Sequence, residues 1–292
     1  MVIQKLIYLD TNLWNKMLDQ SVDPTALVSA LRQSGASIAL SGQTVYELTR
    51  TFSATPERAK KLFRHVKAYV DAGIVGAYDN AELLRAEVKA LYEDADSVVA
   101  YYSPADYAAL KEEVGKLAEG LLDERARSFV SGRLALAQAT RERQNNLFER
   151  RPDMKARLFA VSKDELPGWL DEQVRGDVGA VVLAKHLIHT HSSTDRDAAS
   201  STAQGLLTHP ASRIAKAIVR ADLFWAWRCA RRNSNPRDLA DDLYHVLNAA
   251  YCDVYATADS GQREYASLLL SPWTRPVIYD ENTSLTKWLL TV

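Results

Sequence analysis

The sequence has little cysteine and no long apolar run, and both features limit the classes of protein to which it can belong. Only Cys229 and Cys252 occur in 292 residues, and they form no CxxC pair, so we expect neither a disulfide framework nor a Cys-rich zinc site. No apolar run approaches the roughly 20 residues that span a membrane. The opening residues, MVIQKLIYLD, lack the apolar core and cleavage site of a signal peptide. We therefore expect a cytoplasmic protein with no membrane partner.

The sequence also lacks a strong net charge and the common nucleotide motifs. The formal charge is −1, so any attraction to nucleic acid must come from local patches. GxxxxGK[ST], GxGxxG and GxSxG are absent, which argues against P-loop NTPases, dinucleotide-binding enzymes and α/β-hydrolases. The chain is 47% hydrophobic, which is enough to bury a sizeable core.

Short β-branched or aromatic segments predict strands at the two ends of the chain. These segments are Lys5–Asp10, Ser37–Ser41, Asp253–Ala258 and Pro276–Tyr279. Most of the remaining sequence has helical periodicity, and strands separated by helices imply parallel βα units. Asp23, Thr55 and Ser103 each precede a proline, which predicts a helix start with a side-chain cap.

No strand is predicted between Asn80 and Arg232, and this half of the chain has an all-helical pattern. Predicted strands lie on both sides of it, so it interrupts the α/β part and does not follow it. We therefore predict a three-layer α/β/α core with a mainly parallel sheet from residues 1–79 and 233–292. Residues 80–232 would form a helical insertion.

Acidic residues follow or precede the predicted strands. Asp10 ends the first strand, Glu47 lies early in the helix after the second, and Asp259 ends the third. Asp241 and Asp242 begin the helix before the third strand. Ligands of parallel α/β sheets bind beyond the carboxyl ends of the strands, and clustered carboxylates need a cation. A single strand-end aspartate is commonly a turn or cap residue, but four acids at one sheet edge favour Mg²⁺ or Mn²⁺ and phosphodiester hydrolysis.

Four segments, taken in order, resemble the successive motifs of PIN-domain ribonucleases. They are IYLDTNLW, IALSGQTVYELTR, DDLYHVLNAAYCDVYATAD and PVIYD, and together they cover less than half of the chain. The resemblance implies a PIN-like core in which Asp10, Glu47, Asp242 and Asp259 hold Mg²⁺ or Mn²⁺ and cleave RNA. Asp241 is an alternative to Asp242, because a helix turns the two side chains about 100° apart.

The resemblance also suggests residues that support the acids. Thr11 and Asn12 match positions that stabilise the metal site by hydrogen bonding. His245, one turn after Asp242, could touch substrate or orient water, or could lie on the helix surface. Asp253 is expected to be a strand-start residue.

A strongly amphipathic helix is predicted for residues 213–232, directly before the Asp241-Asp242 segment. Arg213, Lys216, Arg220 and Arg231 fall on one face with Trp227 among them. Basic and aromatic side chains in alternation suit RNA, through phosphate contacts and base stacking. The alternative is a solvated helix whose aromatic side chains pack on a neighbour within the insertion.

The segment HLIHTH contains His186, His189 and His191, which could in principle bind zinc. No helix aligns all three side chains, and no cysteine lies nearby. We therefore expect a structural or surface role for them.

Together these patterns predict a divalent-metal-dependent ribonuclease, an endonuclease that hydrolyses RNA with a metal-activated water. Toxin-type relatives act with an antitoxin, so the resemblance admits an antitoxin-like protein partner, and a homo-oligomer is also open. One alternative is an aspartyl-phosphate phosphotransferase with Asp10 as nucleophile, which is weakened by Asn12 where those enzymes usually have a second aspartate. The other is a PIN-like scaffold that binds RNA or protein without cleaving.

Overall fold

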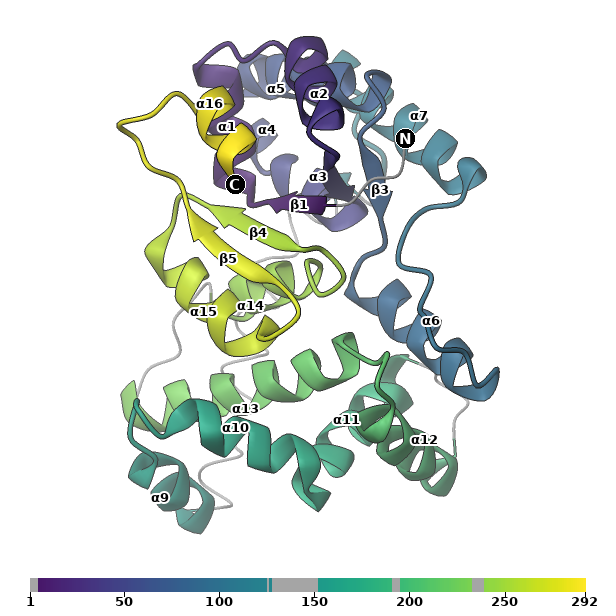
Figure 1. Ribbon diagram of the computed structural model, residues 1–292, viewed down its shortest axis with the longest axis vertical. Coiled ribbons are helices and arrows are strands. Elements are labelled where there is room, and N and C mark those ends of the chain that lie inside the picture. Colours follow the sequence, from purple (N-terminus) through teal and green to yellow (C-terminus); the bar gives the residue numbers. More distant parts are fainter. Residues whose placement is uncertain (1–4, 125, 128–151, 191–194, 233–238) are drawn as a thin grey trace. The chain divides into compact units, whose positions relative to one another are not determined.

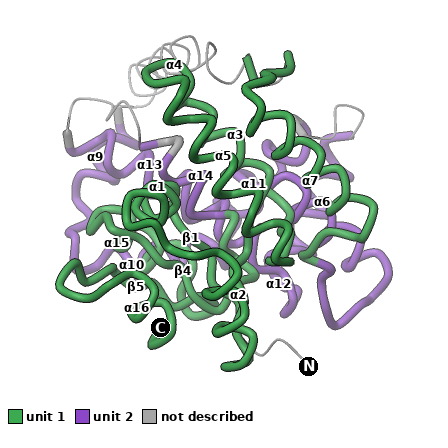
Figure 2. The backbone as a smooth tube through the Cα atoms, turned by 90° about the horizontal axis from the view of Figure 1, so that it is seen from above, with its two compact units in different colours: residues 1–79, 100–133, 248–292 green, residues 80–99, 134–247 purple. Residues whose placement is uncertain are grey.

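The computed structural model describes residues 5–124, 126–127, 152–190, 195–232 and 239–292, and the chain divides into two compact units (Figure 2). Unit 1 comprises residues 1–79, 100–133 and 248–292, and unit 2 comprises residues 80–99 and 134–247. These units differ from the predicted ranges in two places. Residues 100–133 group with unit 1, and the segment up to residue 247 groups with unit 2.

Unit 1 contains a five-stranded, all-parallel sheet in the order β3-β2-β1-β4-β5 (Figure 1). Its strands are β1 (Lys5–Leu9), β2 (Ala36–Ser41), β3 (Val75–Ala77), β4 (Val254–Thr257) and β5 (Arg275–Ile278). The mixed α/β class and the parallel sheet are confirmed, and four strands lie where the sequence predicts them. The short β3 was not predicted. In the described part of residues 80–232 no strand occurs, although Ala77 forms an isolated antiparallel bridge with Tyr101.

The helices of unit 1 begin largely where the sequence signals predict. They are α1 (Thr11–Asp19), α2 (Pro24–Gln33), α3 (Gly42–Leu48), α4 (Thr51–Ala54), α5 (Pro56–Asp71), α7 (Pro104–Glu119), α15 (Ser260–Leu270) and α16 (Leu285–Thr291). The Asp23 side chain caps α2, and Ser103 forms a capping box with Asp106 at the start of α7. Thr55 precedes α5 but makes no side-chain cap.

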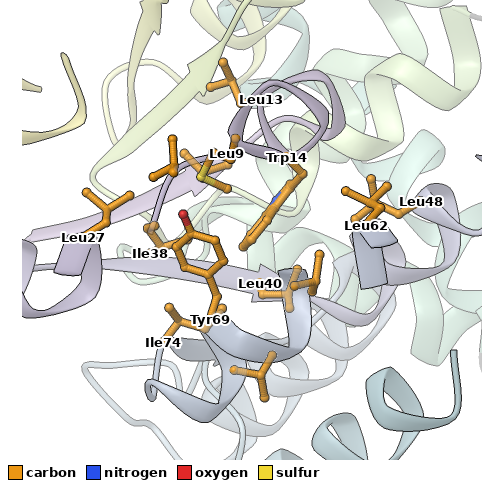
Figure 3. Close-up of a cluster of buried hydrophobic side chains, with 14 of the residues drawn as sticks. Leu9, Leu13, Trp14, Leu27, Ile38, Leu40, Leu48, Leu62, Tyr69 and Ile74 are labelled. Carbon is orange, nitrogen blue, oxygen red and sulfur yellow. The ribbon is translucent and has the colours of Figure 1, made fainter. Parts of the chain in front are cut away.

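Successive strand residues point to opposite sides of the sheet, so its two faces carry different residues. The apolar face packs under α1, α2, α5, α7 and α16 and includes Leu9, Ile38 and Leu40 (Figure 3). The opposite face also carries buried Leu6 and Ala39, and what we call its polar face is the group of five buried residues with side-chain oxygens towards its carboxyl edge: Tyr8, Asp10, Ser41, Tyr255 and Thr257. Helix α15 packs against β4 and β5 and contributes no residue to the apolar core, so it covers the opposite side of the sheet.

Unit 2 is helical throughout its described part. Its helices are α6 (Asn80–Tyr92), α9 (Pro152–Ala160), α10 (Leu166–Arg175), α11 (Asp177–Thr190), α12 (Arg196–Thr208), α13 (Ile214–Arg232) and α14 (Leu239–Leu247). Helix α13 packs on α6, α9, α10, α11, α12 and α14, which makes it the central helix of the unit. Among the helices of both units whose residues are described, none is long and apolar enough to cross a membrane.

A buried carboxylate of α6 caps the start of α13. Glu87 is fully buried and accepts the backbone N–H groups of Arg213 (2.5 Å), Ile214 (2.6 Å) and Ala215 (2.9 Å). The first N–H groups of a helix have no partner within the helix, and a negative charge there is favoured by the helix dipole. Glu87 therefore accepts the first N–H groups of α13, as a cap residue that directly precedes a helix in the sequence does for other helices.

Candidate functional site

Asp10 lies at the carboxyl end of β1, at the N-cap position of α1, but its side chain does not cap that helix. The residue is fully buried (0% exposed). Its Oδ1 accepts a hydrogen bond from the Thr11 hydroxyl (3.2 Å), and its Oδ2 accepts one from the Thr257 hydroxyl of β4 (3.0 Å). The Asp10 side chain is thus directed towards the neighbouring strand β4. It does not have the helix-cap role that strand-end aspartates commonly have.

Thr257 connects two of the predicted acids. Its buried hydroxyl donates to Asp10 and accepts the backbone N–H of Asp259 at 2.9 Å. The pairing of Leu9 with Ala256 brings the residues that follow them, Asp10 and Thr257, side by side. Thr257 was not among the predicted site residues. The signal that could have identified it is the T-x-D spacing at the end of the third predicted strand.

Asp259 is exposed and caps α15. Its Oδ1 accepts the backbone N–H groups of Gly261 (2.6 Å) and Gln262 (3.1 Å). The cap role that strand-end aspartates often have is therefore present here. It engages one carboxylate oxygen, and the second oxygen makes no hydrogen bond or ion pair among the described residues.

Glu47 lies on α3, which follows β2, and its side chain is 8% exposed. Gln43 Nε2 donates to Glu47 Oε1 at 3.3 Å. Burial raises the pKa of the Tyr8 hydroxyl far above its ordinary value, and the nearby charge of Glu47 raises it further. The charge of Glu47 thus acts on Tyr8, which belongs to the same polar face of the sheet as Asp10.

The oxygen donors at this edge suit a hard divalent cation, but they do not form a closed cage. Asp10, Glu47 and Asp259 follow three neighbouring parallel strands, and carboxylates are the preferred protein ligands of Mg²⁺ and Mn²⁺. Within the described residues, no group of three or more His, Cys, Asp or Glu side chains lies close enough to hold a metal ion. Mg²⁺ is usually held by one or two carboxylates together with water. The donor chemistry of Asp10, Glu47 and Asp259 fits such an ion.

The remaining candidates near the fourth predicted acid lie on α14 of unit 2. Asp242 is partly exposed, and the side chain of Asp241 lies outside the described part of the chain. The choice between them stays a prediction. His245 is buried, so the alternative of a helix-surface histidine is wrong. In unit 1, Thr11 bonds Asp10 as described above, and Asn12 is an exposed residue of α1.

The predicted RNA-binding face of α13 needs correction. Trp227 is 4% exposed and donates its indole N–H to the Val161 carbonyl at 2.9 Å. Arg220 is 9% exposed and pairs with Asp171 at 2.5 Å. Because α13 is surrounded by other helices of unit 2, both side chains are used for packing there. The alternative, in which the aromatic side chain packs within the insertion, describes Trp227 correctly.

The other basic residues of α13 differ in exposure. Lys216 is partly buried and donates to the His209 carbonyl at 2.8 Å, and burial lowers its pKa. Arg213, just before α13, is also partly buried, and its backbone N–H is bound by the carboxylate that caps the helix. Arg231 is exposed, and its guanidinium lies over the rings of Trp227 (5.1 Å) and Phe159 (5.7 Å). The Arg231 guanidinium also donates to the Phe159 carbonyl at 3.3 Å, and both residues are exposed on unit 2.

His186 of the histidine segment pairs with an aspartate of α13. His186 Nε2 lies 2.7 Å from Asp222 Oδ2, between α11 and α13 of unit 2. The side chain of His189 and all of His191 lie outside the described residues. This contact gives His186 a structural role, and the predictions for His189 and His191 fall outside the described residues.

Comparison with protein-family models, with curated proteins and with solved structures found no match to this chain. The chain runs from β1 to β2 and β3 on one side of the sheet and places β4 and β5 on the other. The strand order thus reverses between β1 and β4, and in open parallel sheets ligands bind at such a point, beyond the carboxyl ends of the strands.

Proposed function

We propose that this protein is a divalent-metal-dependent ribonuclease whose reaction centre lies at the carboxyl edge of β1 and β4. The observation that carries the proposal is the placement of Asp10. It is buried where the strand order reverses, and it is bound to β4 through Thr257, without capping its own helix. The ordered resemblance of the four sequence segments to PIN-domain ribonucleases supplies the substrate class.

One or two of Asp10, Glu47 and Asp259 would bind Mg²⁺ or Mn²⁺ directly, with water in the remaining positions, and the family resemblance adds Asp242, or Asp241, as a further acid. When bound, such an ion polarises a phosphoryl oxygen and lowers the pKa of a water molecule. The Thr257 hydroxyl restricts the rotation of the Asp10 carboxylate. The backbone N–H groups of α15 hold one oxygen of Asp259 and leave the other free to bind a ligand.

The expected substrate is RNA, bound by few and local contacts. The chain has a formal charge of −1, so no general attraction to phosphates is available. Arg231 and Phe159 are exposed next to each other on unit 2, and this pair could contact a phosphate and stack on a base. Arg220 and Trp227 are not assigned to RNA, because they pack within unit 2.

The first test compares Asp10→Asn with Asp23→Asn. Both replace an N-cap aspartate of unit 1, but Asp23 caps α2 through its side chain and asparagine caps equally well. We expect Asp10→Asn to lose at least about 100-fold of the Mn²⁺-dependent cleavage of labelled single-stranded RNA. Asp23→Asn should retain it. Circular dichroism should show both variants folded, and full activity in Asp10→Asn would refute the assignment.

A non-catalytic scaffold is the second candidate, and one observation favours it: no three acidic side chains of the described chain form a metal group. Calorimetric titration with Mn²⁺ separates the two functions. The ribonuclease requires that wild type binds the ion and that Asp259→Ala binds it more weakly. A wild-type protein that binds RNA but no Mn²⁺ would be the scaffold.

A further inference from the structure

Two tyrosines occupy paired positions on the polar face of the sheet. Tyr8 of β1 lies opposite Tyr255 of β4, and both are fully buried. Their rings are stacked, with centroids 6.2 Å apart and an interplanar angle of 17°. Their hydroxyl groups bond to different helices, and each of these helices is next to a predicted acid.

The Tyr8 hydroxyl bonds the first turn of α3. It lies 2.8 Å from Ser41 Oγ and 2.7 Å from Thr44 Oγ1, and Ser41 Oγ accepts the Thr44 N–H as the cap of the helix. Glu47 follows Thr44 by three residues, and residues three apart are neighbours on a helix surface. The hydrogen bonds of Tyr8 therefore connect the strand that carries Asp10 to the helix that carries Glu47.

The Tyr255 hydroxyl bonds the first turn of α15 in a similar way. It donates to Gln262 Oε1, and the backbone N–H of Gln262 donates to Asp259 Oδ1. Gln262 is thus held by Tyr255 through its side chain and by Asp259 through its backbone. The contact fixes the helix start that Asp259 caps.

The hydroxyl groups are not needed to fill the sheet interior. Phenylalanine has the same ring, and a buried hydroxyl costs free energy unless it is hydrogen-bonded. Fully satisfied buried polar networks fix a specific geometry, because each member accepts few arrangements. We propose that Tyr8 and Tyr255 are positioning residues, which set Glu47 and Asp259, respectively, relative to Asp10. The proposal rests on the ribonuclease function proposed above.

The test uses Tyr8→Phe and Tyr255→Phe, with Tyr69→Phe as the control. Tyr69 of α5 is also fully buried, it lies on the apolar side of the sheet, and among the described residues its hydroxyl has no hydrogen-bond partner. Loss of a residue that orients a metal ligand typically weakens metal binding about 10- to 100-fold. We expect that loss of Mn²⁺ affinity in the first two variants and none in Tyr69→Phe.

Crossed double variants distinguish positioning from general loosening of the fold. In a Glu47→Gln background, Tyr8→Phe should cause no further loss of Mn²⁺ affinity, whereas in an Asp259→Asn background it should cause its full loss. Tyr255→Phe should show the reverse: its full loss with Glu47→Gln and no further loss with Asp259→Asn. Wild-type affinity in both Phe variants would overturn the proposal. So would equal additional losses in both backgrounds, which would indicate a structural role alone.

Hydrogen exchange separates failure of this inference from failure of the proposed function. Tyr8→Phe should accelerate amide exchange in the first turn of α3, and Tyr255→Phe in the first turn of α15, each without changing the other helix. If wild type binds no Mn²⁺, the ribonuclease proposal fails, and this exchange pattern still decides whether each tyrosine fixes its own helix. Unchanged exchange in both helices, or acceleration of both by either variant, would overturn the positioning role.

Discussion

Replacing Thr257 by valine removes a hydroxyl group that makes two buried hydrogen bonds while keeping the shape of the side chain. The hydroxyl donates to the Asp10 carboxylate and accepts the Asp259 N–H. A hydrogen bond to a charged group contributes about 1.5–3 kcal/mol and a neutral one about 0.5–1.5 kcal/mol. The added methyl group returns about 0.8 kcal/mol of burial. We expect Thr257→Val to lower the free energy of unfolding by roughly 1–4 kcal/mol.

Chemical denaturation followed by circular dichroism measures this loss. Thr257→Ser is the matched control, because it keeps the hydroxyl and loses only a methyl group, at a cost of about 1 kcal/mol. In an Asp10→Asn background the hydroxyl donates to a neutral amide oxygen, and charge-assisted bonds are about twice as strong as neutral ones. The penalty of Thr257→Val should therefore fall by about half. An equal penalty in both backgrounds would refute the assignment of the bond to the carboxylate.

Two further predictions concern unit 2. Glu87→Ala should lower the free energy of unfolding by roughly 2–4 kcal/mol, because it removes the cap and the favourable charge at the start of α13. Thermal or urea unfolding measures this loss. Glu87→Gln keeps one acceptor and should lower the free energy of unfolding by less. Burial alone would lower the pKa of His186, but its hydrogen bond and charge attraction with Asp222 outweigh burial and raise the pKa above the usual value of 6.5. The pair therefore stabilises the fold below that value and loses its contribution as pH rises through the folded-state pKa, so wild type should exceed His186→Gln in stability at about pH 5.5 and not at about pH 8.

The strands show what a sequence pattern can and cannot predict. The apolar segments that became β1, β2, β4 and β5 are recognisable because a buried parallel strand is a short, nearly continuous run of β-branched or aromatic residues. Residues Val75–Ala77 carry no such pattern, and β3 was missed. The strand is defined by its parallel pairing with β2, and at Gly76 an added Cβ would come within 2.6 Å of the Tyr102 ring, so its fit depends on contacts outside the segment.

Helical periodicity identifies the buried side of a helix but not the element that buries it. Helix α7 was predicted at its start, yet only the structure shows that Leu110, Val114 and Leu117 join the apolar core of unit 1. The same limitation explains the error at α13. A face that carries Arg220 and Trp227 suggests RNA when drawn on a helical wheel, but in the described part of unit 2 α13 packs against six other helices, and both side chains are buried.

The candidate site was predicted in part. Asp10, Glu47 and Asp259 were identified because acids recur after successive predicted strands. The Thr257 hydroxyl, which donates to Asp10, was missed, because threonine is an ordinary strand residue and only the register of β1 with β4 places it beside Asp10. The buried Glu87 was also missed, since nothing near it in the sequence marks its contact with a helix start more than a hundred residues later.

The pairing of β1 with β4 has a consequence for biosynthesis. Ile7 pairs with Val254, so the two central strands of the sheet leave the ribosome far apart in time, by about 12–50 s at 5–20 residues per second. Throughout that interval the first strand has β2 on one side and a bare edge on the other. Unpaired apolar edges readily join other chains. Nascent copies of this protein should therefore depend on chaperones until the last quarter of the chain is made, and a truncated product that ends before residue 254 should aggregate.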